Sequence, residues 1–242
     1  MKHIILLYTC ILFILSGCKK TVEDSFSAKS DSLNTEIEVI IRETGNSDQN
    51  QKPIVYFTDG EEILNHGVFE KIDSATEADS LPAAYYVFVG SMNGITDTNE
   101  REKYFFCNEE YLSFFENEII KAVESRIGRS FSPDNRSLAG ISFGGMNAAF
   151  FAAQSNAFNR FAMLSPITYP CTELNAKIAF SERKDLNIYI SSGHNDAETY
   201  AKPLVEMFNS KGYHVEFIET TGGHDFDNWN TQWVHMLKFL HH

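Results

Sequence analysis

Short apolar runs bounded by turn-forming residues recur along most of the chain, and this pattern predicts β-strands. Most of the later runs are continuously apolar, which is typical of parallel strands covered on both faces of a sheet. The first two runs, joined by the polar loop 43–52, are expected to form an antiparallel hairpin at the edge of the sheet. The predicted strands are residues 36–42, 53–57, 85–89, 137–141, 161–164, 186–190 and 215–218.

Helical patterns occupy the segments between these strands. Strands that alternate with helices imply right-handed crossovers, and therefore an α/β fold arranged as a three-layer sandwich with a mostly parallel sheet. The chain shows no internal repeat, and 43% hydrophobic residues in a length of 242 can build one large core, so residues 35–242 are expected to form a single domain. The predicted helices are residues 61–72, 109–127, 144–153, 199–211 and 228–240.

The beginning of the chain has the pattern of an export signal. A basic start, residues 1–3, precedes an apolar run at residues 4–15 that is too short to span a bilayer as a mature helix. The run ends in Leu-Ser-Gly-Cys at residues 15–18, which resembles the bacterial lipobox. We therefore expect a lipoprotein signal peptide at residues 1–17 and a lipidated Cys18. The alternative is an ordinary signal peptide in which the cysteine falls by chance.

The segment 18–34 is polar and rich in Ser and Asp, and is expected to be a flexible tether between the lipid and the fold. The predicted location is the bacterial cell envelope, with the protein anchored to a membrane.

An excess of acidic residues, 33 against 20 Lys and Arg, gives a formal net charge of −13. Nucleic-acid binding is excluded as a prediction, because a nonspecific phosphate-backbone binder needs a basic face. The same charge is repelled by anionic membrane surfaces, so lipid rather than a basic patch would hold the protein at a membrane.

Two cysteines, Cys107 and Cys171, remain outside the predicted signal and lipidation site. Each follows the carboxyl end of a predicted strand, so the two are expected to lie near each other around the mouth of an active site, where they can form a disulfide. The alternative is two unpaired buried cysteines. No Cys-x-x-Cys motif or His/Cys cluster suggests zinc, and no metal or cofactor is expected.

The strongest chemical signal is Gly-Ile-Ser-Phe-Gly at residues 140–144, which matches G-x-S-x-G between a predicted strand and a predicted helix. A serine on so tight a turn needs neighbours without a Cβ, and its hydroxyl projects above the edge of the sheet. Ser142 is therefore the predicted nucleophile. The alternative is a glycine-rich turn without catalytic function.

A serine hydroxyl needs a base within hydrogen-bond reach, and His224 is the best placed of the histidines because it follows the last predicted strand. The acid is expected after the preceding strand, where Asp196 is favoured. Asp196 could instead cap the following helix, and Glu198 could replace it as the acid. The two oxyanion-hole donors are predicted to be the backbone N–H groups of Phe143 and Glu61.

From about residue 53 to 240 the chain resembles the esterase branch of the α/β hydrolases, which includes enterochelin esterases, feruloyl esterases, esterase D and the mycolyltransferases. The motifs are Asp59-Gly60 at a strand end, Gly-x-Ser-x-Gly-Gly at residues 140–145, Gly-x-x-Asp at 193–196, and Gly-Gly-His at 222–224 before a helix with Trp229. The resemblance implies an α/β-hydrolase fold, a triad of Ser142, Asp196 and His224, and an ester or thioester substrate.

Arg101 lies in a stretch that resembles an arginine-containing segment of the same family, ahead of the helix that leads to the nucleophile strand. It is interpreted as a structural ion pair in preference to a substrate contact. The sequence departs from enterochelin esterases after Gly60, where Glu61-Glu62-Ile63 lacks the aromatic residue often found there. Catecholate and carbohydrate specificity therefore both stay open.

The predicted function is a membrane-anchored serine carboxylic ester hydrolase that acts through an acyl-enzyme on a small-molecule ester. A siderophore ester and a feruloyl or carbohydrate ester are the candidate substrates. The alternatives are an acyltransferase of the same fold and a surface protein that binds a ligand without catalysis. The oligomeric state is left open.

Overall fold

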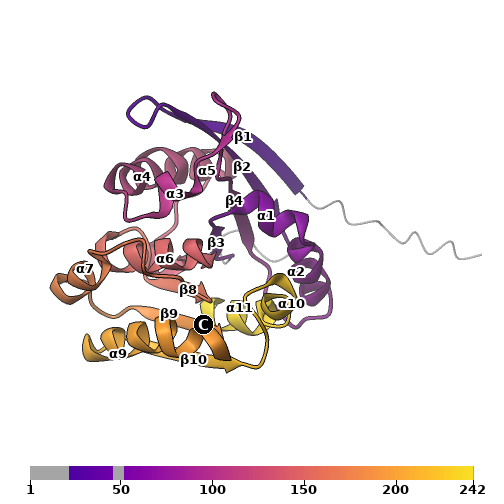
Figure 1. Ribbon diagram of the computed structural model, residues 1–242. Coiled ribbons are helices and arrows are strands. Elements are labelled where there is room, and N and C mark those ends of the chain that lie inside the picture. The colour runs from indigo at the N-terminus through magenta and orange to yellow at the C-terminus, as the bar shows by residue number, and fades with distance from the viewer. Residues whose placement is uncertain (1–21, 46–51, 242) are drawn as a thin grey trace, which may run out of the picture.

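A mixed eight-stranded sheet forms the middle layer of the molecule, with helices on both of its faces (Figure 1). The computed structural model describes residues 22–45 and 52–241. Strands β3, β4 and β7 to β10 run parallel, and only β1 and β2 run antiparallel to their neighbours in this sheet, which confirms the predicted α/β sandwich. The strands in spatial order are β1 (Val22–Ser30), β2 (Thr35–Glu43), β4 (Tyr85–Val89), β3 (Ile54–Phe57), β7 (Arg136–Ile141), β8 (Arg160–Leu164), β9 (Asn187–Gly193) and β10 (His214–Thr220).

Each face of the sheet packs against its own group of helices, because neighbouring residues of a strand point to opposite faces. In β3, Tyr56 belongs to the core cluster formed with α3 to α7 and α9, whereas Phe57 belongs to the cluster formed with α1, α2, α10 and α11. The helices are α1 (Gly60–Asn65), α2 (Val68–Glu77), α3 (Arg101–Phe105), α4 (Glu109–Phe114), α5 (Ile120–Ile127), α6 (Phe143–Gln154), α7 (Leu174–Phe180), α8 (His194–Asp196), α9 (Lys202–Ser210), α10 (Phe226–Trp229) and α11 (Trp233–His241).

The helix that follows the predicted nucleophile lies in the core of the molecule. All residues of α6 from Gly144 to Ala153 are buried, as expected for a helix that is apolar all round. Because α6 packs directly on β7 and β8, its first turn is fixed relative to the carboxyl ends of these strands. A small second sheet, β5 (Met92–Asn93) and β6 (Thr98–Asn99), pairs antiparallel beyond the end of β4.

The antiparallel hairpin at the sheet edge exists, but the predicted partners were wrong. β2 pairs with β1 and β4, whereas β3 lies between β4 and β7 and runs parallel to both. All of β3 is buried, while exposure varies along β2. A continuously apolar strand is stable only where both of its faces are covered, and this condition explains why β3 lies inside the sheet.

The partner of β2 is a segment that the sequence analysis expected to be a flexible tether. Residues 22–30 form β1, in which Phe26 lies opposite Val39 and Ala28 lies opposite Ile37. An edge strand needs apolar side chains on only one face, so its composition is easily mistaken for that of a linker. The predicted signal peptide at residues 1–17 and the predicted lipidation site, Cys18, lie outside the described residues. Within residues 22–45 and 52–241, no helix combines the length and apolarity needed to cross a bilayer.

The predicted helices occur where the sequence places them, but four of the five are interrupted. The segment 199–211 begins in a π-helical turn, η4 (Ala197–Ala201), and continues as α9. The segment 61–72 is split at Gly67, whose φ of 67° ends α1 and begins α2. The segment 109–127 contains a π-helical turn, η2 (Phe115–Ile119), between α4 and α5. A similar break separates α10 from α11. Helical periodicity does not reveal such breaks, because the apolar spacing continues through them on the buried face.

Candidate active site

Ser142 occupies a sharp turn between the end of β7 and the start of α6. Its backbone has a φ of 55° and a ψ of −117°, a conformation that costs a non-glycine residue about 1–3 kcal/mol. The Ser142 N–H donates to the Leu164 carbonyl at 2.9 Å, and the Ser142 carbonyl accepts from the N–H of Met146 at 3.2 Å. These bonds to the next strand and to α6 hold the strained turn.

The glycines around Ser142 are required by the close approach of strand and helix. A Cβ at Gly140 would lie 2.2 Å from the carbonyl oxygen of Gly144, and a Cβ at Gly144 would lie 2.6 Å from the Thr58 hydroxyl oxygen. Both distances are far inside van der Waals contact. The interpretation of the motif, that its flanking positions must lack a Cβ, is confirmed.

The structure brings Ser142, His224 and Asp196 together from three strand ends. His224 Nε2 lies 2.9 Å from Ser142 Oγ, and His224 Nδ1 lies 2.8 Å from Asp196 Oδ2. A carboxylate can only accept, so Nδ1 carries the proton that is donated to Asp196, and Nε2 is left as the acceptor for the serine hydroxyl. The side chains of His224 and Asp196 are 33% and 25% exposed, so water reaches the imidazole.

Asp196, and not Glu198, is the carboxylate that faces the imidazole. Asp196 makes no capping hydrogen bond to the π-helical turn η4 (Ala197–Ala201) that follows it, so the capping role considered for this residue is wrong. Glu198 pairs instead with Lys202, one turn along the helix. The separation between these two acids follows from the helical phase, which points them in different directions.

Asn228, which the sequence analysis did not single out, holds the loop that carries His224. Its side-chain N–H donates to the Gly223 carbonyl at 2.8 Å, and its backbone N–H donates to Asp225 Oδ1 at 3.0 Å. A Cβ at Gly222 would lie 2.5 Å from Asn228 Cγ, which explains the glycine. In the sequence, the only indication that Asn228 holds this loop was its place, as a hydrogen-bonding residue four positions after His224.

The imidazole of His224 also packs edge-on against Trp229, with 5.2 Å between the ring centroids. The indole N–H of Trp229 donates to Ser165 Oγ at 3.0 Å. Trp229 therefore connects the histidine to the end of β8.

The backbone groups of Phe143 and Glu61 lie in the first turns of two helices that start at neighbouring strands. Phe143 is the first residue of α6, Glu61 is the second residue of α1, and the strands before them, β7 and β3, are paired. First-turn N–H groups have no partner inside their own helix, so they are available to an anionic oxygen. The Glu61 carboxylate accepts from the backbone N–H and the hydroxyl of Ser91, at 2.9 Å and 2.6 Å, and this holds the start of α1 against the end of β4.

Arg101 forms an ion pair with a buried carboxylate beside the candidate nucleophile. Its Nε lies 2.7 Å from Asp59 Oδ1, one terminal nitrogen lies 2.8 Å from Asp59 Oδ2, and the same nitrogen donates to the Ile141 carbonyl at 3.2 Å. Burial raises the pKa of Asp59 to about 6, against the opposing effect of the guanidinium. These contacts agree with the structural interpretation of Arg101, because they connect the start of α1 to the residue before Ser142.

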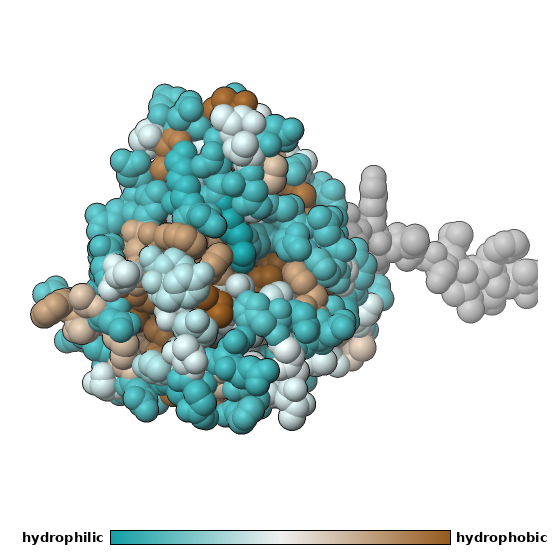
Figure 2. Space-filling view, viewed as in Figure 1, coloured by the Kyte–Doolittle hydropathy of each residue, from teal (hydrophilic) through white to brown (hydrophobic). Residues whose placement is uncertain are grey.

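A cavity of about 510 Å³ opens over these groups, and its lining includes Glu61, Ser142, His224, Phe226 and Trp229. A second hollow of about 630 Å³ adjoins it, shares Asn99 and Arg101 with it, and reaches Phe143. Figure 2 shows hydrophobic residues exposed near the middle of one face of the molecule, within a mostly hydrophilic surround. The site can therefore hold a small organic molecule with both polar and apolar parts.

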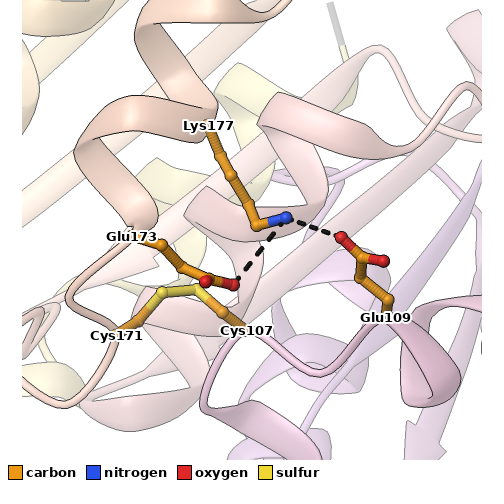
Figure 3. Close-up of a disulfide and its surroundings, with 5 residues drawn as sticks. All are labelled: Cys107, Glu109, Cys171, Glu173 and Lys177. Carbon is orange, nitrogen blue, oxygen red and sulfur yellow. Dashed lines mark hydrogen bonds and ion pairs between the residues drawn. A yellow bond between two sulfur atoms is a disulfide. The ribbon is translucent and has the colours of Figure 1, made fainter.

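The two remaining cysteines are joined. Cys107 and Cys171 form a disulfide with a Cα–Cα distance of 5.7 Å. Their predicted proximity is confirmed, and of the two alternatives left open by the sequence the structure has the disulfide. Beside the bridge, Lys177 lies between Glu109 and Glu173 (Figure 3), at 2.6 Å and 3.7 Å from their carboxylates.

The chain is similar to the iron(III) enterobactin esterase of Escherichia coli strain K12, with 28% identity over 123 residues that make up 50% of this chain and 30% of that protein. The match thus spans less than a third of the curated relative. Among solved structures, the enterobactin esterase from Shigella flexneri matches with a TM-score of 0.78 at 23% identity, over 90% of this chain and 59% of the other. A ferulic acid esterase matches with a TM-score of 0.73 at 16% identity, over 91% and 98% of the two chains.

These structural likenesses confirm the fold predicted from the strand and helix pattern. The family resemblance rests on more than the fold, because a family model described as "Putative esterase" matches residues 30–240, which is nearly the whole of the described chain. The chain therefore belongs to this esterase family.

Proposed function

We propose that this protein is a serine esterase that hydrolyses carboxylic esters through an acyl-enzyme. The observation that carries the proposal is the continuous chain of hydrogen-bond distances, 2.9 Å from Ser142 to His224 and 2.8 Å from His224 to Asp196. Nucleophile, base and orienting acid at these separations are what acyl transfer by serine requires.

In the first half of the reaction, His224 Nε2 accepts the Ser142 proton as the serine oxygen attacks the ester carbonyl. The carbonyl oxygen becomes an oxyanion, which accepts hydrogen bonds from the N–H groups of Phe143 and Glu61. His224 then donates its proton to the departing alcohol, and the acyl group stays on Ser142. Asp196 keeps the imidazole in the required tautomer and stabilises its charged form.

In the second half, His224 takes a proton from water, the hydroxide oxygen attacks the acyl-enzyme, and the proton returns to Ser142 as the acid leaves. The partial exposure of His224 is compatible with hydrolysis, because water reaches the base directly. The names of the similar proteins, enterobactin esterase and ferulic acid esterase, support a siderophore ester or a feruloyl ester as the substrate.

The protein is also proposed to be held at a membrane of the bacterial cell envelope by a lipid on Cys18. The apolar run at residues 4–15 and the lipobox-like residues 15–18 support this. Because β1 begins at Val22, three residues, 19–21, would separate the lipid-bearing Cys18 from the fold, a reach of at most about 14 Å over four residue steps. The acidic domain would then lie close to the membrane surface.

A fluorophosphonate probe tests the catalytic proposal. Wild-type protein is expected to form a stable covalent adduct at Ser142, and the Ser142→Ala variant is expected to form none. An aryl, feruloyl, acetyl-sugar and siderophore ester panel, assayed with and without an added alcohol, then identifies the substrate and separates hydrolysis from acyl transfer. Labelling that persists in Ser142→Ala would exclude Ser142 as the nucleophile.

Metabolic labelling with a palmitate analogue tests the anchor. Wild-type protein is expected to be labelled and Cys18→Ser is expected to be unlabelled, because the modified thiol is absent. Equal labelling of the two proteins would contradict the proposed lipid site.

A further inference from the structure

Four aromatic rings follow one another beside Ser142, and we call Phe106, Phe143, Tyr169 and Tyr200 the aromatic row. The ring centroids are 5.0 Å apart from Phe106 to Phe143, 6.4 Å from Phe143 to Tyr169 and 6.4 Å from Tyr169 to Tyr200. The row crosses from the end of α3, over the residue after Ser142, to the π-helical turn that follows Asp196. Because Phe143 directly follows Ser142, the middle of the row lies next to the nucleophile.

Tyr169 is the exposed member of this row. It is 66% exposed, whereas Phe106, Phe143 and Tyr200 are partly buried. A large ring left open to solvent between two other rings has a face available for stacking. Although Phe143 and Tyr200 are its ring neighbours, most of Tyr169 still faces solvent, so a ligand bound beside Ser142 can contact its ring.

The segment that carries Tyr169, residues 165–171, is held directly against the nucleophile turn. The Ile167 N–H donates to the Ser142 carbonyl at 3.2 Å, and Pro166 packs so closely on α6 that a Cβ at Gly145 would lie 3.2 Å from its Cα. The segment begins at Ser165, which has a φ of 45° and accepts the hydrogen bond of Trp229. A shift of the segment would therefore move Tyr169 relative to the reacting groups.

The disulfide fastens this segment to the other end of the row. Cys107 directly follows Phe106, and Cys171 lies two residues after Tyr169. Lys177 adds an ionic connection between the same two parts of the chain, through Glu109 on one side and Glu173 on the other (Figure 3). The first three rings are thus held at both ends, with Phe143 fixed by α6 in the middle.

We propose that Tyr169 determines specificity by contacting the ring-bearing group of a bulky ester, and that the Cys107–Cys171 disulfide sets its position. This inference rests on the proposed ester hydrolysis. Tyr169 contacts substrate only beyond the scissile bond, so it affects bulky esters and leaves small acyl groups such as acetyl unaffected.

The test compares two p-nitrophenyl esters with the same leaving group, the acetate and the ferulate. The Tyr169→Ala variant is expected to lose about tenfold in kcat/KM for the ferulate, mostly through a higher KM, and to change by less than about twofold for the acetate. Tyr169→Phe keeps the ring and is expected to restore the wild-type preference. Phe180→Ala is the matched control, because Phe180 is an exposed ring, 85% accessible, at the end of α7 outside the row.

The double variant Cys107→Ser, Cys171→Ser tests the second part of the inference. It is expected to reproduce the selective rise in KM for the ferulate, even at a temperature well below its midpoint of unfolding. If it only unfolds more easily while the ratio of the two kcat/KM values is unchanged, the bridge is structural and its positioning role is refuted. If the double variant does not fold, Tyr169→Ala and Tyr169→Phe still decide the contact, because both keep the disulfide.

Failure of this inference differs from failure of the proposed function. Suppose that the wild-type protein reacts with fluorophosphonate and hydrolyses the acetate, but Tyr169→Ala keeps the same preference between the two esters. This result would overturn the role of Tyr169 alone. Wild-type protein that does neither would overturn ester hydrolysis, and the role of Tyr169 with it.

Discussion

The turn that carries Ser142 and the loop that carries His224 are held in place by different kinds of contact. Around Ser142 the backbone is confined by atoms that touch, so that a single added carbon at Gly140 would meet the chain at 2.2 Å. Around His224 the loop is held by polar bonds, chiefly those of Asn228 and Asp196, and the imidazole remains a third exposed. The backbone of the nucleophile turn is thus confined chiefly by steric contact. The loop of His224 is also tight at Gly222, but its imidazole is held by side-chain hydrogen bonds.

Strain accompanies the steric arrangement. The ends of β3, β7 and β8 each carry a non-glycine residue with a positive φ, at Asp59, Ser142 and Ser165. Each such residue costs about 1–3 kcal/mol and persists only where its surroundings over-determine the backbone. The difference between the two regions teaches that replacing the glycines of the turn should act first on the fold, whereas replacing the polar side chains that orient His224 should act mainly on the chemistry.

Replacement of the acid should give the largest effect and confine it to catalysis. Asp196→Asn is expected to lower kcat by about 10⁴-fold, because the amide no longer selects the imidazole tautomer that can accept the serine proton. Glu198→Gln, in the next turn and paired with Lys202, is expected to change kcat by less than about twofold. Steady-state rates on a chromogenic ester, with unfolding in urea as a second readout, check both. The reverse ranking would move the acid to Glu198.

Gly140→Ala, in contrast, should lower the stability of the fold more than it affects catalysis directly. The added methyl meets backbone atoms that cannot move without displacing α6, so a loss of about 3 kcal/mol in the free energy of unfolding is expected. Gly128→Ala is the control, because Gly128 has a φ of 75° but open space around its Cβ position, and should cost only about 1 kcal/mol. Equal losses in urea unfolding would mean that sterics do not dominate at the turn.

The turn at Ser142 and the loop at His224 also differ in how far the sequence could predict them. The turn at Ser142 could be predicted from a short stretch of sequence, because its strand, glycines, serine and helix are contiguous. His224 and Asp196 were found from their order after the last two strands, together with the Gly-Gly-His and Gly-x-x-Asp motifs in their loops. The contact of Trp229 with Ser165 escaped prediction because only the tertiary fold brings these residues together. The bonds of Asn228 are local, and they were missed because an asparagine at this spacing has no distinctive pattern.

The same reasoning explains the errors in the fold. The apolar run of β3 predicted a strand but did not predict which strands lie beside it. Because β3 follows β2 along the chain, a hairpin of the two was expected, but β3 must be covered on both faces and therefore lies inside the sheet. β1 was missed because an edge strand buries only alternate side chains, such as Ala28, and its exposed residues resemble a linker. Pairing between strands depends on which faces must be covered, and this is decided by the whole sheet.

The buried Asp59, which pairs with Arg101 beside the Ser142 turn, predicts that the free energy of unfolding depends on pH. Burial raises the pKa of Asp59 in the folded protein to about 6, above its ordinary value of 3.8. The folded state therefore holds this proton more tightly than the unfolded chain does. The stability that follows from it is fully present below about pH 4 and is lost as the pH rises through about 6.

Asp59→Asn, which cannot ionise, provides the comparison. Its unfolding free energy is expected to lie further below that of the wild type at pH 4 than at pH 7, and the gap should narrow by about 1–3 kcal/mol over this range. Urea unfolding of both proteins at several pH values measures the gap. A gap that widens with pH would mean that the guanidinium outweighs burial in setting the Asp59 pKa.

Asn228→Ala should give the smallest effect, and it tests whether hydrogen bonds alone hold the base. The variant loses the bond to the Gly223 carbonyl and the bond that Asn228 Oδ1 accepts from Gln232, but keeps the capping bond from its backbone N–H to Asp225. Loss of the bond to Gly223 lets the loop shift, so kcat is expected to fall about tenfold, while the free energy of unfolding falls by about 1 kcal/mol. Asp227→Ala, at an exposed position beside Asn228 in α10, is expected to change neither. The rate of fluorophosphonate labelling should fall together with kcat, because both depend on the distance from His224 to Ser142. A fall in stability with unchanged labelling would show that Trp229 packing, and not Asn228, positions the imidazole.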